Sequence, residues 1–236
     1  MRIWEIFPEV AERIRKTHEE VGLFGHHDFA HAFRVGELAY QFALSEWRDR
    51  LVAQSAGLAG MSHNADHIFW HMLGREKYKQ DPDIDKKVGG LVSSWLDGLG
   101  LKNNQVELVI RAVLNHQKPN EDGDNNVTIA LKDADRVANM DADVIIRAGQ
   151  SRPNIPAVDL KYFLDNPEAT FKEPGSVLKD IHFLLEWADP KMTKFCVRTK
   201  LAMEMASKRA NFLKDYIDLT KSQLINAGFY PYPFKN

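Results

Sequence analysis

The stretch GHHDFAHAFRV, residues Gly25 to Val35, holds three histidines and an aspartate at the start of what its pattern predicts to be a buried helix. Apolar residues recur through and beyond it at short, helix-like spacings: Phe29, Phe33, Leu38 and Phe42. This periodicity is typical of a long amphipathic helix, which we expect to end near Trp47. Asp28 is a candidate for its N-cap, and His26 and His27 are interpreted as turn residues that position Asp28.

A second stretch, MSHNADHIFWH, extends from Met61 to His71 and holds three more histidines, so six of the nine histidines fall in two short segments. Imidazole groups bind metal ions and transfer protons near neutral pH. A functional interpretation therefore has to account for both segments together.

Helical spacing recurs along most of the chain, whereas strand-like alternation is scarce. Further helices are predicted at 8–20, from about 51 into the second histidine segment, and at 88–97, 104–116, 127–148, 174–188 and 191–224. The segment 77–90 interrupts this pattern with Pro82 and paired glycines, and 149–171 is expected to be irregular. The sequence therefore predicts a single all-α domain over residues 1–236.

The composition limits the classes of function. With 236 residues and 44% hydrophobic content, the chain is large enough to bury a full core. Its 31 basic and 33 acidic residues nearly balance, which argues against a nucleic-acid polymer or a membrane surface as the main partner. The single Cys196 cannot form an intrachain disulfide, and we find neither a signal peptide nor a membrane-spanning run. We therefore expect a cytoplasmic location.

The spacing of His63 and His67 places both rings on one face of a helix, as in zinc proteases. That chemistry needs a glutamate as general base directly after the first histidine. Asn64 occupies this position, and an amide cannot take a proton from water. We therefore reject the protease interpretation.

Other polar residues stand on separate predicted helices, at positions that otherwise pack against the core. The most informative are His31 ahead of Arg34, His63, His116 in VIRAVLNHQ, and Asp135 in LKDADRVANM. Histidines and a carboxylate that converge from several helices are a common way to build a metal site, and mixed nitrogen and oxygen ligands suit a divalent ion. Asp133, two residues before Asp135, is an alternative carboxylate ligand.

Three motifs in this order carry a resemblance to a known family. They are HAFRV from His31, SHN from Ser62 and DADRVANM from Asp133. The order and context are similar to the HD-domain superfamily of metal-dependent phosphohydrolases, which is named for its His-Asp pair. The resemblance covers roughly residues 20–150 and implies an HD-domain-like helical bundle. Residues 151–236 match no motif and are expected to form a C-terminal helical extension.

The resemblance implies a metal site formed by His31, His63, Asn64 and Asp135. It implies one divalent ion, with Mn, Mg, Fe, Ni, Co and Zn all left open. Asn64 stands where the family has the aspartate of its name, so the site has a neutral carbonyl oxygen in place of a carboxylate. One negative charge fewer beside a cation is expected to weaken metal binding. Asn64→Asp, which changes the shape little, is expected to tighten it.

The resemblance also implies a reaction, the hydrolysis of a small phosphorylated metabolite or nucleotide by a metal-activated water. Asp66 is a candidate proton acceptor, and His67 and His116 are further candidate catalytic groups. Arg34 is expected to bind the phosphate, together with His67 and His116.

Two other functions remain open at this point. A degenerate HD domain would bind a phosphorylated ligand or a protein partner without hydrolysis, and Asn64 favours that alternative. A di-iron HD-type oxygenase would use the surplus histidines at positions 67, 71 and 116. A homo-oligomer is also left open. Metal analysis separates these functions, since about two irons favour the oxygenase and one divalent ion favours the hydrolase.

Overall fold

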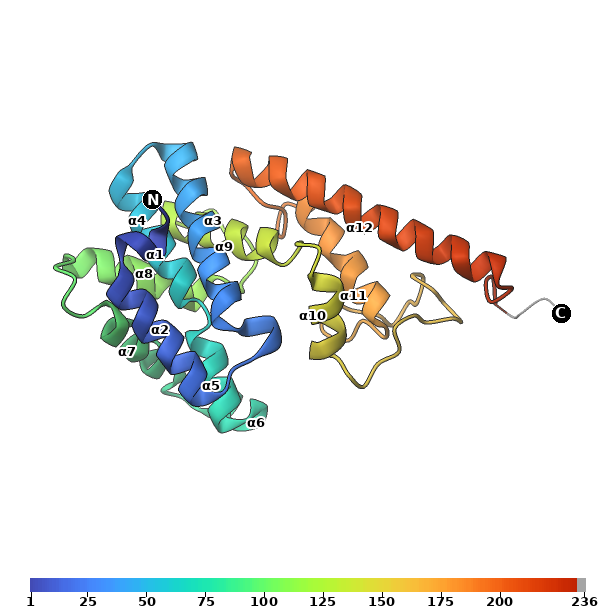
Figure 1. Ribbon diagram of the computed structural model, residues 1–236, viewed down its shortest axis with the longest axis horizontal. Helices are drawn as coiled ribbons and strands as arrows, with labels where there is room; N and C mark the ends of the chain where they lie inside the picture. Colours follow the sequence, from blue (N-terminus) through green and yellow to red (C-terminus); the bar gives the residue numbers. More distant parts are fainter. Residues whose placement is uncertain (233–236) are drawn as a thin grey trace.

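The computed structural model describes residues 1–232, apart from the side chain of His26. The described chain is α-helical and contains no strand, which confirms the predicted all-α class (Figure 1). In chain order the helices are α1 (Ile3–Ile6), α2 (Pro8–Val21), η1 (Gly25–His27), α3 (Phe29–Trp47), α4 (Arg50–Ser62), α5 (Ala65–Leu73), α6 (Arg75–Gln80), α7 (Ile84–Leu96), α8 (Asn103–Asn115), α9 (Asn126–Ala138), α10 (Val144–Ser151), α11 (Val177–Phe183), η2 (Leu184–Ala188) and α12 (Lys200–Asn226).

The centre of the bundle is the pair α3 and α4, against which α9 packs. Small residues let the first two helices approach closely. A Cβ on Gly60 would lie 2.6 Å from Cα of Gly36, so only glycine fits at this crossing. The close approach brings the start of α3 and the end of α4, with their histidines, to the same region of the bundle.

The predicted N-cap of α3 is confirmed. Asp28 has an extended backbone, and its carboxylate accepts a hydrogen bond from the backbone N–H of His31 at 2.8 Å. This bond satisfies one of the free donors of the first helical turn. The orientation of His31 is thus set by the residue that starts its helix.

The predicted helix 127–148 is wrong in one respect, because it is two helices separated by residues 139–143. Arg147 of α10 folds back and donates to the backbone oxygen of Ala138 at 3.1 Å, at the end of α9. Asp141 and Asp143 in the break form ion pairs with Arg34 of α3. The break contains neither glycine nor proline, and tertiary ion pairs hold two of its side chains.

The predicted helix 191–224 is also wrong at its start, since α12 begins at Lys200 with Thr199 as N-cap. The buried carboxylate of Asp133 accepts hydrogen bonds from the backbone N–H groups of Arg198 and Thr199, at 2.9 and 2.7 Å. Asp133 therefore holds the N-terminus of α12, a structural role. Two further boundaries differ, because α7 begins within the expected break at 77–90, and the expected helix 174–188 is α11 followed by the short 3₁₀ helix η2.

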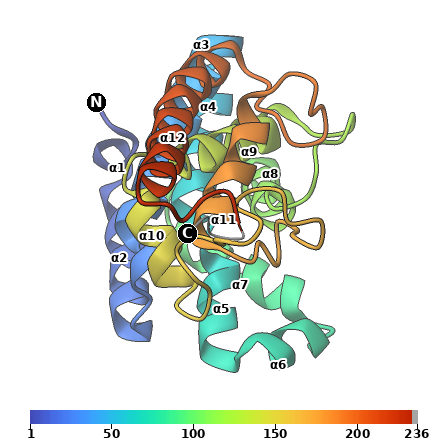
Figure 2. The same cartoon turned by 90° about the vertical axis from the view of Figure 1, so that its right-hand side faces the viewer.

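Helices α10 to α12 lie to one side of the bundle, with α12 along their edge (Figures 1 and 2). Helix α12 packs against α3 and α9 near its start and against α11 beyond them. Buried residues of this region, including Leu178 and Leu213, belong to the same apolar cluster as Phe42 of α3. The division into an HD-like core and a C-terminal extension stays a prediction. Among the described residues, no helix combines the length and apolar character that crossing a membrane requires.

Candidate metal centre

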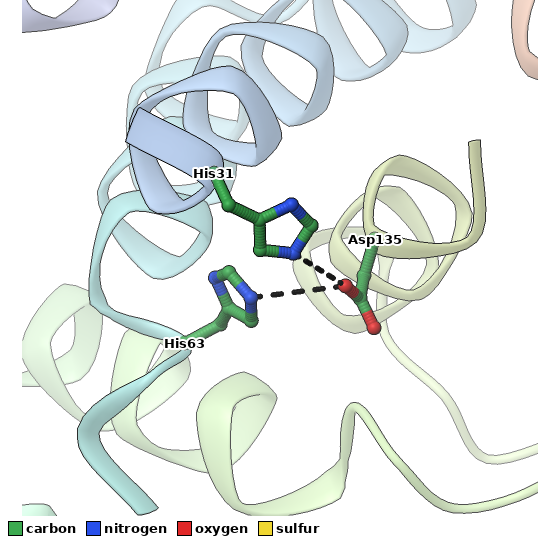
Figure 3. A group of neighbouring side chains, drawn as sticks. All are labelled: His31, His63 and Asp135. Atoms are coloured by element: carbon green, nitrogen blue, oxygen red, sulfur yellow. Dashed lines mark ion pairs between the residues drawn. The ribbon is translucent and has the colours of Figure 1, made fainter. Parts of the chain in front are cut away.

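Three side chains predicted to share a metal ion converge in the structure (Figure 3). His31 comes from the first turn of α3, His63 directly follows α4, and Asp135 lies on α9. Oδ1 of Asp135 lies 3.4 Å from Nε2 of His31 and 3.7 Å from Nε2 of His63. One ligand atom from each residue lies within 4.8 Å of the other two. The predicted convergence is confirmed, and of the two aspartates it is Asp135 that faces the histidines.

The two separations from Oδ1 of Asp135 fit a single ion. Ligand atoms held about 2.0 to 2.2 Å from one cation are roughly 3 to 4 Å from one another. The rings of His31 and His63 are buried, with about 1% exposed, whereas the Asp135 side chain is 21% exposed. The group is thus enclosed on the histidine side and open beside the carboxylate.

Backbone carbonyls set the protonation of the histidine rings. Nδ1 of His63 lies 2.7 Å from the oxygen of Gly60, and Nδ1 of His116 lies 2.6 Å from the oxygen of Val113. A carbonyl only accepts, so each Nδ1 carries a proton, and in the neutral form of either ring the lone pair lies on Nε2. Nε2 of His63 is buried, has no hydrogen bond within the described structure, and faces Asp135. This tautomer is the one in which Nε2 binds a metal ion.

Burial lowers the pKa of His63 well below its ordinary value, and the neighbouring histidines lower it further. The ring is therefore neutral near pH 7. Burial by itself raises the pKa of Asp135, but the hydrogen bond with His31 and the neighbouring imidazoles lower it, so that the net pKa lies well below its ordinary value. The group therefore combines a neutral nitrogen donor with a carboxylate anion, the protonation that a divalent cation requires.

The surrounding histidines form a row of ring contacts that connects the two histidine-rich stretches. In order along the row, the rings are His67, His27, His31, His63 and His116, with centroid separations of 3.5, 6.1, 5.2 and 5.4 Å. His27 lies in the turn before Asp28, as expected, and its ring also stacks on that of His67. His71 is exposed and His26 has no described side chain, so neither is assigned to the row.

Asp66 and His67 are linked by Gln117, which the sequence analysis did not single out. The amide nitrogen of Gln117 donates to Oδ2 of Asp66 at 2.7 Å and lies 3.1 Å from Nε2 of His67. Burial lowers the pKa of His67, so its neutral Nε2 accepts this hydrogen bond. In the sequence, only its position directly after His116 could have pointed to Gln117 as a residue of the site. The catalytic roles of Asp66, His67 and His116 stay predictions.

Asn64 is fully buried, and its amide faces the backbone. Nδ2 donates to the carbonyl oxygens of His27 at 2.8 Å and Asp28 at 3.3 Å, and lies 3.5 Å from Nε2 of His18. Two carbonyl acceptors require an amide nitrogen here. Oδ1 of Asn64 is buried without a hydrogen-bond partner in the described structure, which leaves it free to be a neutral ligand. That role stays a prediction.

Arg34, expected to bind phosphate, forms ion pairs with carboxylates in the break between α9 and α10. Its guanidinium lies 2.8 Å from Oδ2 of Asp141 and 3.1 Å from Oδ2 of Asp143. These contacts join α3 to the C-terminal helices. They do not test the phosphate-binding role, which stays a prediction, but any phosphate would have to compete with two carboxylates for this arginine.

No protein-family model matches the chain, and no curated protein matches it by sequence. Solved structures do match. The crystal structure of an HD-superfamily hydrolase from Bacillus thuringiensis is 17% identical in sequence, with a TM-score of 0.63, and the match covers 94% of this chain and 97% of that one. A crystal structure from Lactobacillus plantarum is 15% identical, with a TM-score of 0.60, and the match covers 93% and 96% of the two chains.

These similarities show a fold shared with an HD-superfamily hydrolase over nearly the whole chain, including the C-terminal helices that matched no motif. The predicted resemblance is thereby confirmed at the level of the fold. Within that fold, the two histidines and the aspartate of the motifs HAFRV, SHN and DADRVANM form a candidate metal-binding group.

Proposed function

We propose that the protein is a metal-dependent hydrolase of a small phosphorylated substrate. The observation that carries the proposal is the convergence of His31, His63 and Asp135, with a buried Nε2 lone pair directed at the carboxylate. A buried nitrogen without a partner is costly unless another atom fills its place. A divalent cation fits both the donor set and the spacing.

A divalent ion held there would act as a Lewis acid, which polarises a phosphoryl oxygen and lowers the pKa of water. The protein supplies two imidazoles and one carboxylate to hold it, and Asn64 adds no charge. The open side of the group, next to Asp135, is where a substrate phosphate can approach.

His67 and His116 flank the metal-binding group, and each has a described polar contact that constrains its ring. A neutral imidazole in this place accepts a proton from water, and once protonated it donates to a phosphate oxygen. Asp66 is less free to act as the base, because Gln117 and the backbone N–H of His67 each bind one of its oxygens. We therefore place His116 ahead of Asp66 as the proton acceptor, whereas Nε2 of His67 already accepts a hydrogen bond from Gln117.

The test is a phosphatase assay on para-nitrophenyl phosphate with Mn²⁺ added to metal-free protein. We expect turnover that needs the ion and falls on the order of 100-fold or more in His31→Ala and Asp135→Asn. His182→Ala on α11 is the matched control and should keep the wild-type rate. Hydrolysis that is equal with and without metal, or unchanged in Asp135→Asn, would reject the proposal.

The orientation of Asn64 favours one alternative, a domain that binds a phosphorylated ligand without hydrolysis. Its amide is neutral and donates to the carbonyls of His27 and Asp28, so this position contributes no negative charge to the metal-binding group. Saturable binding of metal and inorganic phosphate, without turnover of phosphate esters, would establish the binding function. About two irons per chain in protein purified without added metal would instead support the oxygenase.

A further inference from the structure

Asn139, at the end of α9, contacts the carboxylate of the candidate metal centre. Its Nδ2 donates to Oδ1 of Asp135 at 2.9 Å. This is the same oxygen that lies 3.4 Å from Nε2 of His31 and 3.7 Å from Nε2 of His63. Only 8% of Asn139 is exposed, so the hydrogen bond is largely shielded from water.

Arg147 of α10 determines which way the Asn139 amide faces. Nη1 of Arg147 donates to Oδ1 of Asn139 at 3.3 Å. A guanidinium group has donors only, so the amide oxygen faces the arginine and the amide nitrogen faces Asp135. Arg147 therefore keeps the Nδ2 donor of Asn139 directed at Asp135.

Arg147 is itself held at two further points. Nη2 donates to the backbone oxygen of Ala138 at 3.1 Å and to Oδ1 of Asp143 at 3.0 Å. Asp143 also binds Arg34, one turn after His31 on α3. The contacts thus form a path from Asp135 on α9 through α10 to the helix that carries His31.

We infer that Asn139 is a positioning residue for the metal ligand Asp135, and that Arg147 acts through it. The inference rests on the proposed metal site. A carboxylate turns about its last side-chain bond, and a fixed donor on Oδ1 restricts that rotation while leaving a second lone pair on the same oxygen for a cation. The residues that orient metal ligands in this way typically contribute 10- to 100-fold to metal affinity.

The test is a titration of metal-free protein with Co²⁺, which reports affinity and, through its visible absorption bands, the ligand geometry. Asn139→Leu keeps the volume and removes the donor. We expect its Co²⁺ dissociation constant to rise about 10- to 100-fold and its absorption bands to shift. Arg147→Met, which leaves the amide free to turn, should change both readouts in the same direction by a smaller factor.

Matched controls separate positioning from general stability. Asn120 also accepts a hydrogen bond from an arginine, Arg136 at 2.7 Å, and donates to the backbone oxygen of Cys196 at 2.8 Å. Asn120→Leu should therefore lower the melting temperature and leave Co²⁺ affinity and spectrum unchanged. Arg152→Met, which removes the ion pair of Arg152 with Asp180, is the corresponding control for Arg147.

The outcomes distinguish this inference from the proposed function. If the wild-type protein shows no saturable Co²⁺ binding, the metal site fails and the role of Asn139 fails with it. If wild type binds and His31→Ala does not, the metal site stands. In that case, an Asn139→Leu protein with the Co²⁺ affinity and spectrum of the wild type would overturn the role of Asn139 and leave the metal site standing. If Asn139→Leu does not fold, unchanged Co²⁺ affinity and spectrum in Arg147→Met would overturn the role of Asn139.

Discussion

At the scale of single residues, the structure gives Asn64 two hydrogen-bond acceptors that its sequence-based interpretation did not include. As an isosteric change, Asn64→Asp was expected to cost little. The structure adds a cost, because the variant would replace an amide donor with an oxygen that faces the carbonyls of His27 and Asp28. We predict that the metal-free variant loses about 1 to 3 kcal/mol of unfolding free energy, since two buried acceptors lose their partner.

Mn²⁺ should restore part of this loss, because a cation offsets the added charge. Urea unfolding with and without Mn²⁺ measures both effects. Asn104→Asp, an exposed change in the first turn of α8, is the control and should be nearly neutral. Wild-type stability of metal-free Asn64→Asp would mean that the Asn64 amide does not hold the turn before α3.

At the scale of secondary-structure elements, the contact between α3 and α4 depends on Gly60. An added Cβ would lie 2.6 Å from Cα of Gly36 and 2.8 Å from the backbone oxygen of Val35, and backbone cannot move aside as a side chain can. We predict that Gly60→Ala forces the helices apart, lowers the unfolding free energy by about 1 to 3 kcal/mol and weakens metal binding.

Gly90→Ala on α7 provides the matched control. A Cβ there meets no atom within 4 Å, so the change should stabilise the helix by about 0.5 to 1 kcal/mol. Thermal unfolding of both variants measures the expected loss of stability in Gly60→Ala and the expected gain in Gly90→Ala. A Gly60→Ala protein as stable as wild type would show that the helices have room to separate without loss.

The elements that the sequence predicted well are those determined locally. Helix α3 has a capping aspartate and a regular apolar stripe, and both the cap and the end at Trp47 match the prediction. The break between α9 and α10 was missed because its cause lies elsewhere in the chain, in Arg34. The start of α12 was missed for the same reason, since Asp133 holds it from α9.

In the candidate site, too, the residues in local sequence motifs were predicted and those that depend on tertiary contacts were not. Histidines and an aspartate in recognisable motifs identified the three converging residues. The partners that orient them were not predictable, because Asn139 and Gln117 are ordinary polar residues whose roles depend on tertiary contacts. The amide direction of Asn64 likewise follows from carbonyls positioned by the turn before α3.

At the scale of the whole molecule, buried histidines make stability depend on pH. Burial lowers the pKa of His18, His63 and His67, so their rings stay neutral in the folded protein at pH values where the unfolded chain takes up protons. The unfolded state then binds more protons, and stability falls as pH drops below about 6.5. Above that pH this contribution is fully present.

Urea unfolding of metal-free protein at about pH 7.5 and about pH 5.5 measures this effect, and we predict a lower unfolding free energy at the acidic pH. His18→Leu should lose less on acidification than wild type, because one of the neutral buried rings is gone. An unfolding free energy that does not change between the two pH values would contradict the protonation assigned to these rings.

The central claim is that His31, His63 and Asp135 hold one divalent ion. The most direct measurement is a crystal structure of the protein with Mn²⁺, in which anomalous scattering locates the ion. The account predicts one peak per chain, bounded by Nε2 of His31, Nε2 of His63 and Oδ1 of Asp135, and no such peak in Asp135→Asn. An ion bound elsewhere, or no ion between these three atoms at saturating Mn²⁺, would contradict it.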